Sequence, residues 1–159
     1  HYIEDLYQSA ILHDIGKVGI PDSILLKPGK LTDTEFNTIQ RHCSIGGDAI
    51  SNVESKINIQ SFLTLGKEIA YNHHEKWDGT GYPFGLAEEK IPLSARIISL
   101  ADVYDALTST RPYKKAFSHE KAKSIILEGE GKHFDPTIVQ AFLLQENEFD
   151  KIRETYGQI

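Results

Sequence analysis

The stretch from Ser94 to Ser109, SARIISLADVYDALTS, decides the fold class of this chain. Its apolar residues recur at the spacing of three and four that gathers side chains on one face of an α-helix. The expected inner face comprises Ile97, Ile98, Ala101 and Tyr104 or Asp105. The stretch therefore predicts a long amphipathic helix that packs against other helices.

Helices are also predicted on both sides of this stretch. Thr32 and Glu35 form a T-x-x-E capping box that opens a helix, and Asp135-Pro136 supplies a cap and an N1 proline for another. The expected helices cover residues 3–14, 32–43, 45–53, 62–75, 94–109, 118–129 and 136–145. The stretches 21–31 and 76–92 are too rich in glycine and proline to be helical. Without an alternating strand pattern, the prediction is an all-α fold in one domain, residues 1–159.

Composition excludes several classes of protein. The 159 residues carry a net charge of -6, which argues against a general nucleic-acid binder because such proteins present a basic face. No apolar run reaches the length of a membrane span, and the first residues do not resemble a signal peptide. The single cysteine, Cys43, is compatible with a reducing cytoplasm, which is the expected location. The chain begins without methionine and reads as part of a longer protein.

Seven histidines, several of them beside acidic residues, point to a metal. His13-Asp14 offers a nitrogen ligand next to a carboxylate, which can bridge two cations. Most pairs of this kind are instead a histidine at a helix end beside a solvated acid. His73-His74 strengthens the metal hypothesis because imidazole is the commonest transition-metal ligand, although a lone His73 would be interpreted as a core residue.

Two further residues complete the candidate set. Asp102 lies in an apolar stretch, where an unpaired carboxylate would be costly to bury, so either a basic partner or a cation is expected beside it. His42 lies at the end of the helix that the capping box opens. The set then holds two acids and four imidazoles.

Five motifs resemble the HD-GYP subgroup of the HD-domain phosphohydrolases, in order and over nearly the whole chain. They are HDIGK at 13–17, GIPDSILLKPGKLT at 19–32, HHEKWDGTGYP at 73–83, IPLSARIISLADVYDALTSTRPYKKAFS at 91–118 and HFDPTIVQAF at 133–142. The resemblance implies an all-helical HD-domain bundle with a GYP loop. It also implies hydrolysis of cyclic di-GMP to the linear dinucleotide pGpG, with GMP after a second cut.

The resemblance also implies roles for individual residues. Asp14 would be the bridging carboxylate and, with Lys17, the catalytic pair. One metal site would comprise His42, His73, His74 and Asp14, and a second would comprise His13, Asp102 and Asp14. The expected substrate contacts are Lys17, Tyr82, Arg111 and Lys114. Two or three divalent transition-metal ions are expected, Fe or Mn first, to activate water and to neutralise the phosphate.

The chain departs from the family pattern at its start. The family has a preceding helix that supplies another histidine ligand, so we expect the domain to be truncated at its N-terminus and these residues alone to hydrolyse poorly. An N-terminal receiver or sensor domain is expected in the full-length protein, and a homodimer remains open. Two alternative functions also remain. One is a catalytically silent cyclic di-GMP sensor or interaction module, and the other is a different HD-type nucleotide hydrolase.

Overall fold

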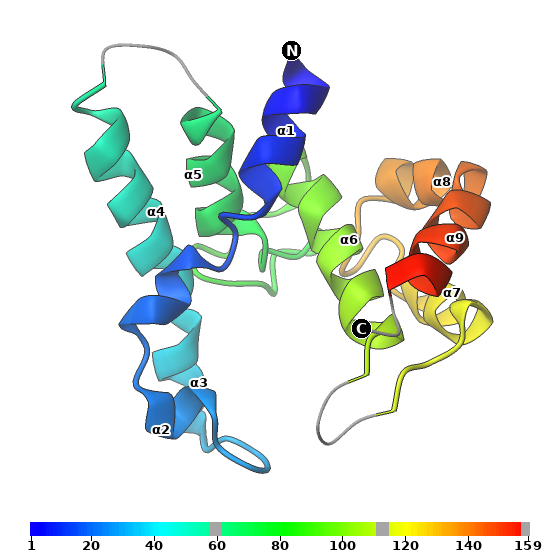
Figure 1. Ribbon diagram of the computed structural model, residues 1–159, viewed down its shortest axis with the longest axis horizontal. Coiled ribbons are helices and arrows are strands. Elements are labelled where there is room, and N and C mark those ends of the chain that lie inside the picture. Colours follow the sequence, from blue (N-terminus) through cyan, green and yellow to red (C-terminus); the bar gives the residue numbers. More distant parts are fainter. Residues whose placement is uncertain (58–61, 111–114, 157–159) are drawn as a thin grey trace.

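Helix α6 (Leu93–Thr108) runs through the middle of the protein, and the other helices pack on either side of it (Figure 1). The computed structural model describes residues 1–57, 62–110 and 115–156. On one side, α5 packs on α6 and is contacted by α1 and α4, while α7 and α8 pack on the other side. Within these ranges no residue belongs to a β-strand and no helix is long and apolar enough to cross a membrane. The predicted all-α class is confirmed.

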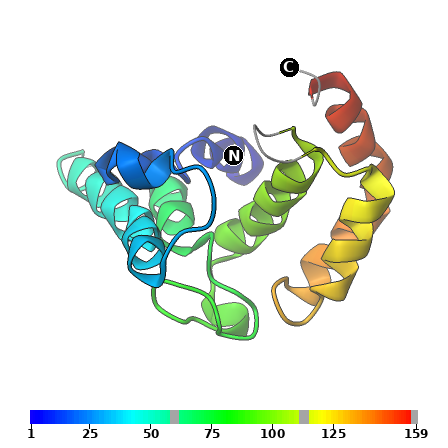
Figure 2. The same ribbon diagram turned by 90° about the horizontal axis from the view of Figure 1, so that it is seen from below.

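The other elements follow the chain from end to end. They are α1 (Tyr2–Ala10), η1 (Ile15–Gly19), α2 (Asp22–Leu25), α3 (Asp33–Gln40), α4 (His42–Glu54), α5 (Leu63–Asn72), η2 (Glu88–Lys90), α7 (His119–Glu128), α8 (Pro136–Leu144) and α9 (Glu146–Tyr156), where η marks a 3-10 helix. Seen from below, α7, α8 and α9 form one group and α1 to α5 another, with α6 between them (Figure 2).

Local capping signals in the sequence correctly locate several helix starts. Thr32 accepts a hydrogen bond from the Glu35 amide, and the Glu35 carboxylate accepts one from the Thr32 amide, so the capping box is confirmed. Ser118 and Asp135 likewise accept bonds from backbone amides in the first turns of α7 and α8. These bonds satisfy amides that have no partner inside the helix.

Several predicted boundaries were wrong. The helix expected over residues 32–43 divides at Arg41, so His42 begins α4 instead of ending the preceding helix. Arg41 keeps helical dihedral angles, which explains why no glycine or proline marks the division. The first helix ends at Ala10 instead of residue 14, the loop at 21–31 contains the one-turn helix α2, and α9 was not predicted.

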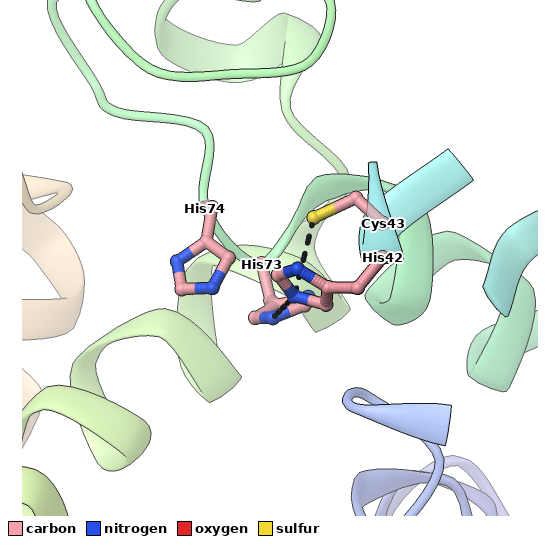
Figure 3. Close-up of side chains that lie close together, drawn as sticks. All are labelled: His42, Cys43, His73 and His74. Carbon is pink, nitrogen blue, oxygen red and sulfur yellow. Dashed lines mark hydrogen bonds between the residues drawn. The ribbon is translucent and has the colours of Figure 1, made fainter. Parts of the chain in front are cut away.

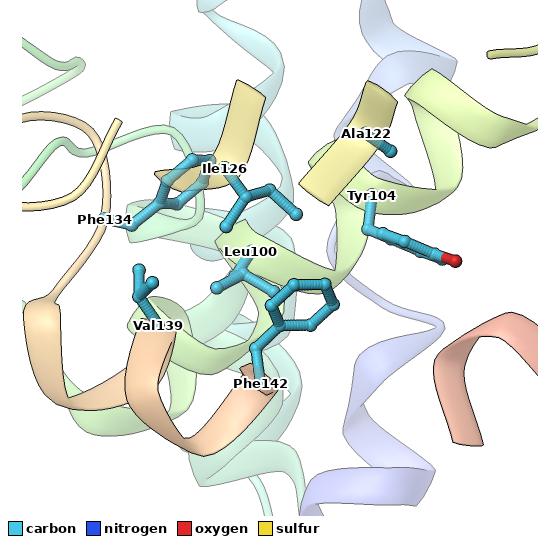
Figure 4. Close-up of a cluster of buried hydrophobic side chains, with 7 residues drawn as sticks. All are labelled: Leu100, Tyr104, Ala122, Ile126, Phe134, Val139 and Phe142. Carbon is cyan, nitrogen blue, oxygen red and sulfur yellow. The ribbon is translucent and has the colours of Figure 1, made fainter. Parts of the chain in front are cut away.

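The main apolar core lies where α6, α7 and α8 meet (Figure 4). Its buried members are Leu100, Tyr104, Ala122, Ile126, Phe134, Val139 and Phe142. Of the expected inner face of α6, Tyr104 is confirmed as a core residue, whereas Ile97, Ile98 and Ala101 are only half-buried. Helices pack on two sides of α6, so its buried surface is wider than a single stripe.

Glycines allow η1 to lie directly on α4, which brings the segments around Asp14 and His42 together. A Cβ atom on Gly16 would lie 1.9 Å from the backbone oxygen of His42 and 2.5 Å from the backbone nitrogen of Gly46. No side chain fits in this space. The close backbone contact explains why a helix tolerates Gly46 in its interior, where glycine costs about 1 kcal/mol relative to alanine.

Replacing Thr32 with alanine is expected to lower the free energy of unfolding by about 1 kcal/mol, because the substitution removes the N-cap of α3. Urea denaturation followed by circular dichroism would measure the loss. Thr38, whose hydroxyl donates to the Thr34 carbonyl within the same helix, provides the control. Equal stabilities of the Thr32→Ala and Thr38→Ala variants would contradict this account of the cap.

Candidate metal centre

Four segments that are far apart in sequence bring the candidate ligands together, and one of them is α6, which carries Asp102. His13 and Asp14 lie in the turn between α1 and η1, and His42 is the first residue of α4. His73 and His74 follow the last turn of α5. Figure 3 shows the side chains of His42, His73 and His74 gathered at the facing ends of α4 and α5.

One oxygen of Asp14 faces two of these histidines. Asp14 Oδ1 lies 3.4 Å from His42 Nε2 and 3.8 Å from His73 Nε2, and the two Nε2 atoms lie 3.4 Å apart. This oxygen is buried and has no hydrogen-bond partner among the residues that the structure describes. A buried acceptor without a donor is unfavourable unless something else satisfies it.

Backbone carbonyls determine which ring nitrogen each histidine turns toward the centre. The Nδ1 atoms of His13, His42 and His73 lie 2.7, 2.7 and 3.0 Å from the carbonyl oxygens of Ala10, Ile39 and Ile69. A carbonyl only accepts, so each Nδ1 carries a proton, and in the neutral rings of His42 and His73 the Nε2 atom is left with a lone pair. Metal-binding histidines are held in this way by their outer hydrogen bonds.

Burial keeps the inner histidines neutral. It lowers the pKa of His42, lowers that of His73 to about 4 and lowers that of His74 to about 3. Neutral imidazole is the form that binds metals. Nε2 lone pairs and a carboxylate oxygen thus face each other without a proton between them, and a divalent cation fits this set of donors.

The second oxygen of Asp14 faces the other candidate ligands. Asp14 Oδ2 lies 3.2 Å from His13 Nε2 and 2.5 Å from Lys17 Nζ, and His13 Nε2 lies 3.8 Å from Asp102 Oδ1. Burial would raise the pKa of Asp14, but the hydrogen bonds of His13 and Lys17 hold it well below its usual range. Asp14 therefore stays ionised and presents its two oxygens to two groups of candidate ligands.

Cys43 is a member of the cluster that the sequence did not reveal. One ligand atom from each of His42, Cys43, His73 and His74 lies within 4.8 Å of the others. Burial raises the pKa of the Cys43 thiol to about 12, which disfavours the thiolate form that binds metals. Its position next to His42 was the only signal in the sequence.

The loop from Lys76 to Pro92 covers one side of the cluster. The Tyr82 amide donates to the His74 carbonyl at 3.2 Å, and the rings of Tyr82 and His74 lie 4.8 Å apart between centroids. Burial raises the pKa of the Tyr82 hydroxyl, which therefore stays protonated and able to donate a hydrogen bond. The predicted substrate contacts Arg111 and Lys114 lie outside the described residues.

Comparisons with known proteins agree with this arrangement of candidate metal ligands. The HD-domain family matches residues 3–138, which is most of the chain. The chain belongs to the HD-domain family. A cyclic di-GMP phosphodiesterase of Vibrio cholerae is 63% identical over 93% of this chain and 30% of its own length. The predicted place in the HD-GYP subgroup of HD-domain proteins is confirmed.

Two further proteins that resemble this chain act on a different cyclic dinucleotide, as their names state. A 3'3'-cGAMP-specific phosphodiesterase of Vibrio cholerae is 43% identical over 89% of this chain and 26% of its own length. The solved structure of a cyclic GMP-AMP-specific phosphodiesterase from V. cholerae matches 91% of this chain and 39% of its own, with a TM-score of 0.59 and 22% identity. This structural likeness confirms the HD-domain fold. The chain spans about a third of the length of the curated relatives it matches.

Proposed function

We propose that this chain is the catalytic domain of a metal-dependent phosphodiesterase that hydrolyses cyclic di-GMP to pGpG, with GMP after a second cut. The observation that carries the proposal is the buried Oδ1 of Asp14, which has no hydrogen-bond partner in the described part of the chain and faces the Nε2 atoms of His42 and His73. The 63% identity to a cyclic di-GMP phosphodiesterase supports the choice of substrate.

Asp14 would be a ligand in both proposed metal sites. The first site would also comprise His42, His73 and His74, and the second His13 and Asp102. Mixed imidazole and carboxylate ligands suit Fe or Mn, and the cluster would hold two or three ions. When bound, such ions lower the pKa of water and neutralise charge on a phosphate.

The chain's own residues would orient the substrate. Lys17 Nζ, on a side chain that is 42% exposed, places a positive charge at the edge of the centre, where a phosphate oxygen can reach it. The protonated hydroxyl of Tyr82 would donate to the substrate, or its ring would stack on a guanine base. Arg111 and Lys114 remain proposed contacts to the same ligand.

The proposal extends to the rest of the protein. An N-terminal receiver or sensor domain would control the activity in the cytoplasm, and a homodimer would be compatible with it. Residues 1–159 would belong to this domain.

A second candidate substrate is 3'3'-cGAMP. The 43% identity to a 3'3'-cGAMP-specific phosphodiesterase favours it. The two ligands differ in one purine base and share the phosphodiester ring, so the same metal centre would serve both.

The test is turnover of both dinucleotides by the full-length protein, with metal content measured on the same sample. We expect bound Fe or Mn, cleavage of cyclic di-GMP faster than that of 3'3'-cGAMP, and loss of both activities after chelation. Faster cleavage of 3'3'-cGAMP would favour the second candidate. Binding of cyclic di-GMP without cleavage by metal-loaded protein would refute the enzymatic proposal and indicate a sensor.

A further inference from the structure

Glu75 is a buried carboxylate directly after the His73-His74 pair, and it binds the loop instead of the metal cluster. Its side chain is 2% exposed. Oε1 accepts a hydrogen bond from the Phe84 amide at 2.7 Å, and Oε2 accepts one from the Leu86 amide at 3.0 Å. Among the residues that the structure describes, Glu75 forms no ion pair with a lysine, arginine or histidine.

The two bonds need two acceptor oxygens, and a carboxylate provides both. Burying a charge without a cation is costly unless several donors satisfy it, and here the donors are backbone amides. A glutamine would keep one acceptor oxygen and turn its NH2 group toward an amide that also donates. One backbone amide of the loop would then lose its partner.

The bonds of Glu75 hold the half of the loop that carries Tyr82. The loop doubles back on its own start so closely that a Cβ atom on Gly81 would lie 2.3 Å from the backbone nitrogen of Lys76. Tyr82 follows Gly81, and residues 84–86, which Glu75 binds, come immediately after. Tyr82, whose ring lies against His74, is therefore held on both sides in sequence. The close backbone contact at Gly81 precedes it, and the amides that Glu75 binds follow it.

The first half of the loop is held independently. The amides of Trp77 and Asp78 donate to the carbonyls of His133 and Lys132 at 3.1 and 2.9 Å, in the turn before α8. Loss of Glu75 should therefore loosen residues 84–86 and leave the contacts of Trp77 and Asp78 in place.

We propose that Glu75 is a positioning residue whose carboxylate fixes residues 84–86 and so keeps Tyr82 at the substrate side of the metal centre. The part that concerns the substrate rests on the proposed function. The part that concerns the loop rests on the contacts of Glu75 alone.

The test compares Glu75→Gln with wild type and with Glu54→Gln. Glu54 is a matched control because its carboxylate also accepts two bonds, from Thr64 and Lys67, but it joins α4 to α5 away from the cluster. Amide hydrogen exchange at Phe84 or Leu86, whichever amide then faces the NH2 group, should accelerate at least about tenfold in Glu75→Gln only, as expected for losing a bond to a charged group. Exchange at Trp77 and Asp78 should stay unchanged.

Kinetics of the metal-loaded full-length protein supply the second measurement. In Glu75→Gln we expect KM for cyclic di-GMP to rise about tenfold, with a smaller change in kcat and the wild-type metal content, because binding is weakened and the centre is intact. Glu54→Gln should have wild-type KM. If Glu75→Gln does not fold, Glu75→Asp, which keeps the charge at a shorter reach, should show the same changes to a smaller degree.

The outcomes separate the two proposals. Unchanged exchange at Phe84 and Leu86 in a folded variant would overturn the role of Glu75, as would faster exchange with unchanged KM. Faster exchange in a protein whose wild type cleaves neither dinucleotide would support the role of Glu75 in the loop and count against the proposed function.

Discussion

Asp14→Ala protein is expected to lose the proposed metal ions and the proposed phosphodiesterase activity together. The two oxygens of Asp14 face different groups of ligands, His42 and His73 on one side and His13 on the other. Removing the carboxylate therefore takes a ligand from both proposed ions. Loss of an outer partner costs about 10–100-fold in metal affinity, and loss of a shared direct ligand should cost more than that for each ion.

Metal analysis after dialysis, with turnover on the same samples, would measure the effect. Lys17→Met should keep its metal and weaken substrate handling, because Lys17 supplies charge for the phosphate and no ligand atom. Cys43→Ser should also keep its metal, since burial disfavours the thiolate of Cys43. Wild-type metal content in Asp14→Ala would refute the bridging assignment, and loss of metal in Cys43→Ser would assign the cysteine to the ligand set.

Gly16→Ala is expected to destabilise the protein by about 3 kcal/mol or more, at the upper end of the cost of overpacking. The added methyl group would meet backbone atoms of His42 and Gly46, which cannot move aside as a side chain can. Either η1 separates from α4 or the protein unfolds. Separation would pull Asp14 away from His42, so metal affinity should fall as well.

Gly19→Ala provides the matched control, in the same 3-10 helix. Its added methyl group would lie 3.0 and 3.1 Å from the Cγ2 and Cδ1 atoms of Ile45, which can rotate, so a smaller loss is expected. Denaturation midpoints and metal content of the two variants would test the comparison. If Gly16→Ala is no less stable than Gly19→Ala, the close backbone contact is not what sets the position of η1.

Features encoded within a few residues could be predicted from the sequence. Thr32, Ser118 and Asp135 cap their helices with bonds to amides two or three residues away, so their roles depend on local sequence alone. The loop from Lys76 to Pro92 is marked by its glycines and prolines in the same way. The types of the candidate ligands could also be predicted, because histidine and aspartate are rare in apolar stretches unless they have a structural or functional role.

The tertiary structure alone decided where those ligands meet. His42 and His73 are 31 residues apart, and their contact depends on how α4 packs on α5 and η1. The division at Arg41 has no local signal, since both sides keep helical dihedral angles. The place of Cys43 in the cluster and the bonds of Glu75 to the amides of Phe84 and Leu86 also depend on the tertiary structure.

The chemistry of the side chains is thus set by the sequence, and their protonation and partners are set by packing. His74 is an ordinary histidine until burial lowers its pKa to about 3. Asp14 is an ordinary carboxylate until the fold leaves one of its oxygens buried without a hydrogen-bond donor among the described residues. Local hydrogen bonds act over one helical turn, whereas desolvation and convergence of ligands require segments from several helices to exclude water together.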